Sequence, residues 1–423
     1  MAEDHYHPLR RQVLDEVHAR PFQLTRAPRR FLHAAFTIDQ AGGEAAVQAL
    51  DHWCTTTGGE RPAPGANFHR IAFPSARLRW ERHTEFTTYT WDTACTADEP
   101  FGWPLAEASP VGDALPAPGP LLAAVDLVII AADGAPDELS LLFDQTSLCV
   151  ASVHDGAARI ITDFRQDARG STRILVIDRG LHPQVAGALV QRLLEIETYR
   201  TFALLGLPEA MRSAPVVGRI ETELVHVTGQ MRAASDLADN SVLLDRLMAL
   251  ASELEAEAAV CAYRFGATRA YDAIVRSRLE VVGERPVEGY LTWKAFLDRR
   301  MAPAMRTCQT VADRQAELAR KLSRAANLLR TRVDIEVEQQ NRAVLQAMNE
   351  RARLQLRLQQ TVEGLSVAAV SYYVIALFGV IFEGMRDAGL TAAEPGILSA
   401  LAVPVVIGAI WLIVRRIRRK HSE

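Results

Sequence analysis

The sequence lacks the short motifs that mark the common enzyme classes. It has no Gly-rich phosphate-binding loop, no HExxH metal-binding motif and no GxSxG nucleophile motif. Its five cysteines are widely spaced and form no CxxC pair, so neither a disulfide framework nor a zinc site is predicted. These absences predict a protein that is not an enzyme and that holds no metal or other cofactor.

The chain also lacks an excess of positive charge. The chain has 47 Lys and Arg residues against 51 Asp and Glu residues, which gives a formal net charge of −4. Nucleic acid is therefore not an expected partner, because proteins that bind it carry a strongly basic surface. The first thirty residues contain no apolar run of the kind found in a signal peptide. We expect the bulk of the chain to stay in the cytoplasm.

Long uncharged apolar runs are found near the C-terminal end. Residues 365–382 and 397–414 contain no charged side chain, and each run is long enough to cross a bilayer as a helix. Several arginines precede the first run and a basic tail follows the second, whereas the connecting turn has a single basic residue. Lys and Arg near span ends are retained on the cytoplasmic side. We therefore predict a membrane hairpin with both termini inside.

The first 180 residues contain the patterns that predict strands. The apolar run at 121–131 and the stretch at 172–178 predict buried strands, and residues 41–54 have helical spacing. Further strands are predicted at 30–38 and 67–73, and two more within 78–91 around a polar turn at 82–84. The stretches 139–153 and 157–164 flank a hairpin turn at His154-Asp155-Gly156. This mixture predicts an α+β cytoplasmic domain over residues 1–180.

From residue 181 onward the pattern is helical. We predict a helical region at 181–300, a long stalk helix at 301–364, the transmembrane hairpin at 365–414 and a basic cytoplasmic tail at 415–423. Apolar residues recur along the stalk at Val337, Val344, Met348, Leu358, Val362 and Leu365. A single helix of this length is not stable alone, so we expect the stalk to self-associate along this apolar seam.

Three stretches of the sequence resemble one protein family. They are DEVHARPF at 15–22, RRMAPAMRTC at 299–308 and the stretch 339–373, which begins QQNRAVLQ and ends AVSYY. All three resemble the DUF3422 family of bacterial membrane-anchored proteins. The resemblance implies a protein of the bacterial cytoplasmic (inner) membrane, in contact with the lipid bilayer, and it supplies no activity or catalytic residue.

The order of the predicted elements resembles that of the CorA-type magnesium transporters. In those homopentamers a cytoplasmic α/β domain leads through a long helix into the first span, which lines the pore and ends in a Gly-Met-Asn signature. Here the corresponding residues are Gly384-Met385-Arg386, and a ring of arginines would repel Mg²⁺. The resemblance implies a homo-oligomer that moves an inorganic ion, with pore or outer-loop candidates at Glu363, Ser366, Tyr373, Glu383, Gly384, Met385, Arg386 and Asp387.

Two other functions stay open. His18 and Arg20, within the HARPF stretch, have the chemistry to bind a phosphate or a carboxylate, although packing of His18 and pairing of Arg20 inside the domain is the favoured interpretation. The chain would then be a membrane-anchored scaffold or sensor whose cytoplasmic domain binds a partner or a small ligand. A membrane-tethered enzyme that uses the same stretch is the third hypothesis.

Overall fold

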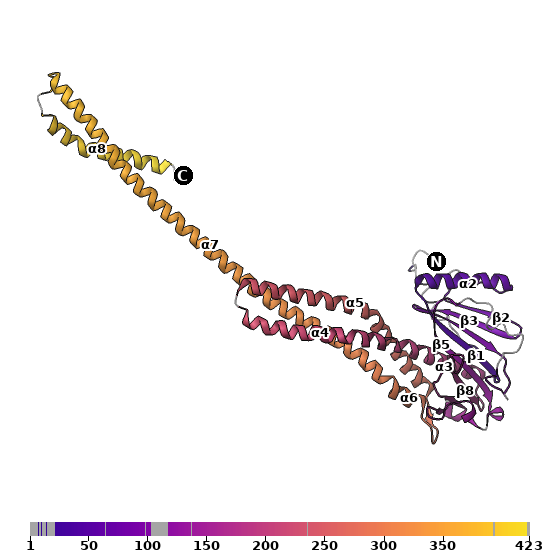
Figure 1. Ribbon diagram of the computed structural model, residues 1–423. Coiled ribbons are helices and arrows are strands. Elements are labelled where there is room, and N and C mark those ends of the chain that lie inside the picture. Colours follow the sequence, from indigo (N-terminus) through magenta and orange to yellow (C-terminus); the bar gives the residue numbers. More distant parts are fainter. Residues whose placement is uncertain are drawn as a thin grey trace. The chain divides into compact units, whose positions relative to one another are not determined.

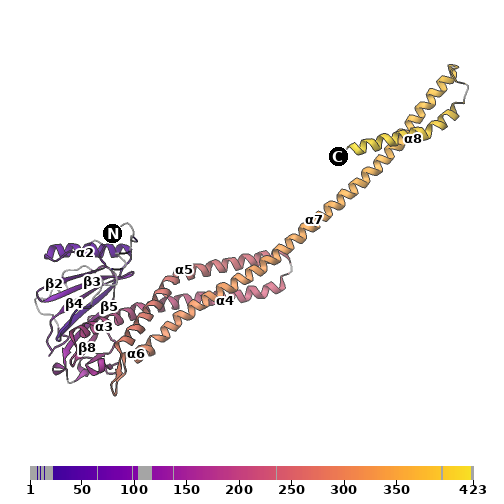
Figure 2. The same cartoon turned by 180° about the vertical axis from the view of Figure 1, so that it is seen from behind.

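A computed structural model describes most of the chain. The described residues are 7, 10, 14, 22–63, 65–97, 99–102, 117–136, 138–234, 236–391 and 394–420. The chain divides into two compact units, the first formed by 1–230 with 245–326 and the second by 231–244 with 327–423. Figure 1 labels most of the elements of both units, and Figure 2 shows them from behind.

The first unit is built on a mixed β-sheet. Within the described residues the sheet has nine strands in the order β2-β3-β4-β1-β5-β8-β7-β6-β9, and β5 and β8 pair in parallel. The strands are β1 (Arg29–Thr37), β2 (Phe68–Ala72), β3 (Ala76–Arg82), β4 (Phe86–Thr93), β5 (Leu121–Ala131), β6 (Cys149–Val153), β7 (Ala158–Thr162), β8 (Thr172–Asp178) and β9 (Arg285–Pro286). The predicted α+β class of the N-terminal region is confirmed.

Two of the helices begin at residues whose side chains cap them. Asp39 accepts a hydrogen bond from the Gly42 amide at the start of the first described long helix, and Thr292 accepts one from Ala295 at another start. The helices are α2 (Gln40–Thr57), α3 (Pro183–Leu204), α4 (Gly206–Ala233), α5 (Leu237–Val282), α6 (Trp293–Arg300), α7 (Ala302–Asp387) and α8 (Pro395–Lys420), with short 3₁₀ turns η2 (Ala132–Gly134), η3 (Leu139–Leu141) and η4 (His154–Gly156).

Two helices cover opposite faces of the sheet. Leu50 and Trp53 of α2 pack in one cluster with Leu78, Trp80 and Trp91, which project from one face of β3 and β4. On the other face, α3 packs on the strands in a cluster that includes Phe31, Leu127, Ile174, Val176, Leu189 and Leu193. The sheet is thus a central layer, and the site described below lies on the α3 side.

The predicted strand at 139–153 is wrong over its first half. Residues 139–141 form the 3₁₀ turn η3, and the strand begins at Cys149. The physical reason is a local turn: the Asp144 carboxylate accepts a hydrogen bond from the Thr146 amide at 2.8 Å, which competes with an extended backbone. The turn predicted at 154–156 is confirmed, with Asp155 in the left-handed region at φ 56°.

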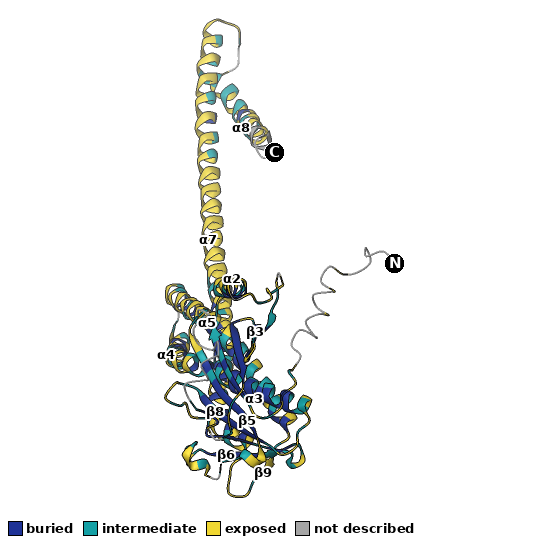
Figure 3. Cartoon of the chain, turned by 90° about the vertical axis from the view of Figure 1, so that its right-hand side faces the viewer, coloured by how far each residue is buried: buried dark blue, intermediate teal, exposed yellow. Residues whose placement is uncertain are grey.

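The second unit contains most of α7 together with α8. The helix α7 runs without a break for 86 residues, so the predicted stalk does continue into the first apolar run. Both α7 and α8 contain stretches long and apolar enough to cross a membrane, and only 6% of each stretch is buried within the chain. Figure 3 shows this exposure along the second-unit part of α7. The predicted domain boundaries stay predictions.

Candidate functional site

The residues predicted from the sequence do not form one site within the described chain. His18 and Arg20 lie outside the described residues. The pore and outer-loop candidates all lie on α7, at Glu363, Ser366, Tyr373, Glu383, Gly384, Met385, Arg386 and Asp387. Glu363 and Arg386 are separated by about 35 Å along this helix, at a rise of about 1.5 Å per residue.

Among these α7 residues, Glu363 lines a hollow between α7 and α8. This hollow of about 550 Å³ is also lined by Trp411 and Arg415 of α8, and the Arg415 guanidinium lies 4.9 Å from the Trp411 ring centroid. The Ser366 hydroxyl donates a hydrogen bond back to the Val362 carbonyl at 2.8 Å. Tyr373 contacts the ring of Tyr372.

A different group of polar residues gathers in the first unit, on the sheet face that α3 covers. In the half of the sheet built by β5 and β8 this face is apolar. In the other half, polar side chains occupy the same face and lie beside one another across the strands. Cross-strand pairing aligns Arg70 of β2, Arg79 of β3, Thr90 of β4 and His33 of β1.

A cleft of about 250 Å³ lies between this polar half of the sheet and the helices α3 and α5. We call it the polar cleft. Its sheet side is lined by His33, Arg79, Glu81, His83, Phe86 and Thr88. Its helix side is lined by Gln191, Leu194, Glu195, Thr198, Tyr199 and Arg278. All twelve residues belong to the first unit.

His33 lies at the floor of the polar cleft in a fixed, neutral state. Its Nδ1 and Nε2 atoms lie 2.8 and 2.9 Å from the hydroxyls of Thr90 and Thr198. The Thr198 hydroxyl donates its proton to the Leu194 carbonyl, so it must accept from His33 Nε2–H, and Thr90 then donates to Nδ1. Burial, followed by the charge of Arg79, lowers the pKa of His33 to about 3.

Three buried polar atoms in the polar cleft make no hydrogen bond to any residue that the structure describes. They are Arg79 Nε, Thr88 Oγ1 and Gln191 Oε1. Arg79 Nε is 3.6 Å from Glu81 Oε1, which is close enough for an ion pair but too long for a hydrogen bond. An unpaired buried polar group costs about 1–3 kcal/mol, and such groups call for a partner. The cleft therefore offers both donors and acceptors to an occupant.

The charges that face the polar cleft are balanced. Arg278 forms an ion pair with Glu195, which also accepts a hydrogen bond from Gln191 Nε2 at 2.9 Å. On the sheet side, Arg79 and His83 both lie near the Glu81 carboxylate, at 3.6 and 3.8 Å. This arrangement suits a neutral or zwitterionic compound better than a strongly charged one.

Aromatic rings form the mouth of the polar cleft. A second hollow of about 500 Å³ adjoins the cleft and shares His83, Phe86 and Tyr199 with it. His83 stacks on Phe86 with 4.2 Å between ring centroids, and Tyr199 stacks on Tyr271 at 5.5 Å. Burial and then hydrogen bonding to Glu85 raise the pKa of Tyr271, so this phenol stays protonated at neutral pH. The mouth offers ring faces and edges to an incoming compound.

Comparison with known proteins identifies the family of the chain. A family model described as "Protein of unknown function (DUF3422)" matches residues 5–421, so the chain belongs to that family. No curated protein and no solved structure matches it.

Proposed function

We propose that this member of the DUF3422 family is a membrane-anchored protein whose cytoplasmic unit binds a small polar ligand in the polar cleft. The observation that carries the proposal is the set of buried polar atoms, Arg79 Nε, Thr88 Oγ1 and Gln191 Oε1, that lack hydrogen bonds within the described chain and line one cavity. A ligand with both donor and acceptor groups would satisfy them. The chain would act as a sensor of that ligand.

The size of the polar cleft limits the ligand. Its volume of about 250 Å³ lies below the range of about 300–1,000 Å³ that is usual for drug-sized ligands. The balanced charges and the aromatic mouth further favour a compact neutral or zwitterionic compound, in the size range of an amino acid. A large nucleotide would leave most of its surface outside the cleft.

Thermal-shift measurements on the purified full-length protein test this function. The panel consists of amino acids, small dicarboxylates and nucleosides, and a ligand raises the melting temperature by binding the folded state. We expect at least one compound to stabilise the wild type and to lose this effect with Thr88→Val. The matched control is Thr55→Val on the exposed side of α2, which should respond as the wild type does. The proposal is wrong if every compound that raises the melting temperature of the wild type raises that of Thr88→Val by the same amount.

The membrane anchor is the second part of the proposal. The apolar stretches of α7 and α8 are almost wholly unburied within the chain, which supports a bilayer as their surroundings. Basic residues flank the hairpin on one side, so both termini should face the cytoplasm of the inner membrane. A fluorescent protein fused after residue 423 should therefore fluoresce in cells and remain with the membranes after an alkaline wash. A soluble fusion would refute the anchor.

A CorA-like oligomer that transports an inorganic ion is the second candidate function. It is favoured by the apolar seam of α7, because Val344, Met348 and Leu358 are 58–66% exposed in the single chain and call for a partner helix. Native mass spectrometry in nanodiscs should then show a discrete oligomer, a pentamer by analogy. Ion flux into liposomes should change with Arg386→Asn. A monomer would leave no axis for a pore, and the sensor function would stand alone.

A further inference from the structure

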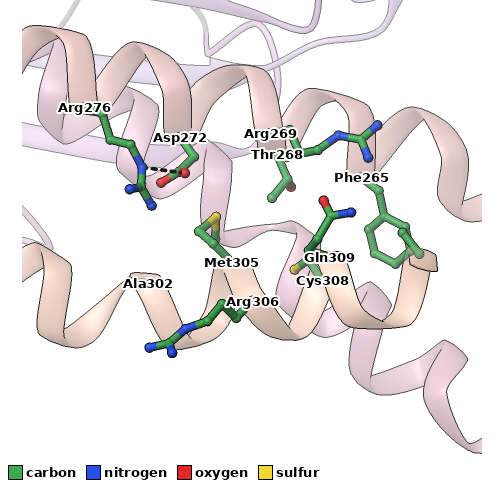
Figure 4. A pocket seen from close by; sticks show the side chains of 11 residues that line it. Phe265, Thr268, Arg269, Asp272, Arg276, Ala302, Met305, Arg306, Cys308 and Gln309 are labelled. Atoms are coloured by element: carbon green, nitrogen blue, oxygen red, sulfur yellow. Dashed lines mark hydrogen bonds and ion pairs between the residues drawn. The ribbon is translucent and has the colours of Figure 1, made fainter. Parts of the chain in front are cut away.

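A second cavity in the first unit lies between α5 and the beginning of α7. Figure 4 shows this groove, which has a volume of about 380 Å³. Thr268 of α5 and Met305, Cys308 and Gln309 of α7 point into the space between the two helices. The groove shares no lining residue with the polar cleft, so the two are separate cavities and can bind different compounds.

The floor of the groove is apolar and well buried. Phe265 and Cys308 are 4% and 3% exposed. Thr268 is 1% exposed, and its hydroxyl is satisfied because it donates to the Ala203 carbonyl at 3.0 Å. Met305, Ala302 and Ala312 complete the apolar lining. With the Thr268 hydroxyl already bonded, the floor offers an occupant carbon and sulfur atoms, which favours an apolar body.

The rim of the groove carries an excess of positive charge. Arg276 is paired with Asp272 at 2.9 Å, which is the ion pair drawn in Figure 4. Arg269 and Arg306 form no hydrogen bond or ion pair with any residue that the structure describes. Figure 4 shows Arg276 and Arg306 toward one end of the groove and Arg269 toward the other, beside Phe265. Three guanidinium groups therefore surround an apolar cavity that holds a single carboxylate.

We propose that this groove binds a small amphipathic anion, with a carboxylate or phosphate head on an apolar body. Unpaired guanidinium groups bind such heads through two parallel hydrogen bonds, and the arginine that carries the contact is Arg306 or Arg269. The apolar body lies along Met305 and Cys308. Tight binding needs both parts of the site. An inorganic anion would leave the apolar floor in contact with water, and a neutral hydrocarbon would leave the arginines without a partner.

Protection of the Cys308 thiol tests the proposal on the full-length protein in nanodiscs. The rate at which N-ethylmaleimide labels Cys308 is followed by site-resolved mass spectrometry in rising concentrations of octanoate, and in parallel of octyl phosphate. We expect saturable protection of Cys308. Cys54 is 0% exposed on the sheet-facing side of α2, so its labelling rate reports any general change in stability and should stay constant.

Neutral and cationic probes and arginine variants separate the outcomes. Octanol and octylammonium should protect Cys308 much less than octanoate does. Arg269→Ala or Arg306→Ala should raise the half-protecting concentration about tenfold, the effect of one lost charged hydrogen bond. The matched control is Arg300→Ala, an exposed arginine of α6 outside the groove. Equal protection by octanol, or unchanged protection in both groove variants, would overturn the proposal.

Discussion

His33 connects the stability of the first unit to pH at the scale of a single residue. Its pKa is lowered from the ordinary value of 6.5 to about 3 in the folded protein, so the unfolded state takes up a proton first as pH falls. The free energy of unfolding should therefore fall between pH 6.5 and 3, by at most about 1.4 kcal/mol per pH unit from this group. Above pH 6.5 its contribution is constant.

The variant His33→Gln isolates this effect. A glutamine amide can still donate to Thr198 and accept from Thr90, but it does not titrate. Thermal melts of the full-length protein, followed by tryptophan fluorescence between pH 7.5 and 4.5, should show a flatter pH dependence in the variant. An unchanged slope would mean that other groups determine the pH response.

A buried ion pair within the sheet gives a larger prediction. Arg30 Nε and Nη2 donate to the two carboxylate oxygens of Asp126 at 2.8 and 2.6 Å, and both side chains are at most 3% exposed. Removing one partner of a buried pair leaves the other charge uncompensated and costs about 3–5 kcal/mol. Denaturation of Asp126→Ala should show that loss. Asp51→Ala, which breaks a solvent-exposed pair with Arg61, should cost far less, because water screens that pair.

At the scale of elements, the close contact of α3 with the segment before β1 depends on a glycine. A Cβ atom at Gly187 would overlap the carbonyl oxygen of Gln23, whereas one at Gly229 of α4 would meet nothing within 4 Å. Gly187→Ala should therefore destabilise the first unit by about 1–3 kcal/mol. Gly229→Ala should stabilise it by about 0.5–1 kcal/mol, because alanine is the better helix former. Melting temperatures that shift in the same direction would contradict this packing.

The elements themselves were largely predictable from local patterns. The continuous apolar run Leu121–Ala131 and the stretch Thr172–Asp178 match β5 and β8 residue for residue, because buried strands contain little else. The prediction failed at 139–148, where the Asp144 side chain stabilises a turn that hydrophobicity does not reveal.

The polar cleft was not predictable in the same way. Thr88 and Thr90 alternate with Tyr89 and Trp91 along β4, and such alternation does not tell whether the polar side meets water or a helix. Helix α3 buries that side, and it begins about a hundred residues later in the chain, at Pro183. The position of this helix is a long-range packing result. The sequence feature that could have indicated the cleft is the number of threonines in β4, which pairs with the strand that contains Trp80.

The molecule as a whole combines a polar cleft with an apolar hairpin. The apolar faces of α7 and α8 are exposed in the single chain. The proposed bilayer and the proposed self-association would cover them. The sequence alone predicts these surfaces, since they depend on composition and period and not on tertiary packing. The proposed ligand site is the reverse case, because the residues that line the polar cleft come together only in the folded first unit.

The proposal that the polar cleft binds a ligand is tested most directly by the melting temperature of the ligand-free full-length protein, with Thr88→Val compared with Thr90→Val. Both residues are buried on the same face of β4, but Thr90 bonds His33 at 2.8 Å whereas Thr88 Oγ1 has no hydrogen bond to the described chain. If Thr88 is reserved for a ligand, its replacement by valine should leave the melting temperature unchanged or raise it by about 2–4 °C. Thr90→Val should lower it. An equal fall in both variants would show that the Thr88 hydroxyl is structural, and it would contradict the account.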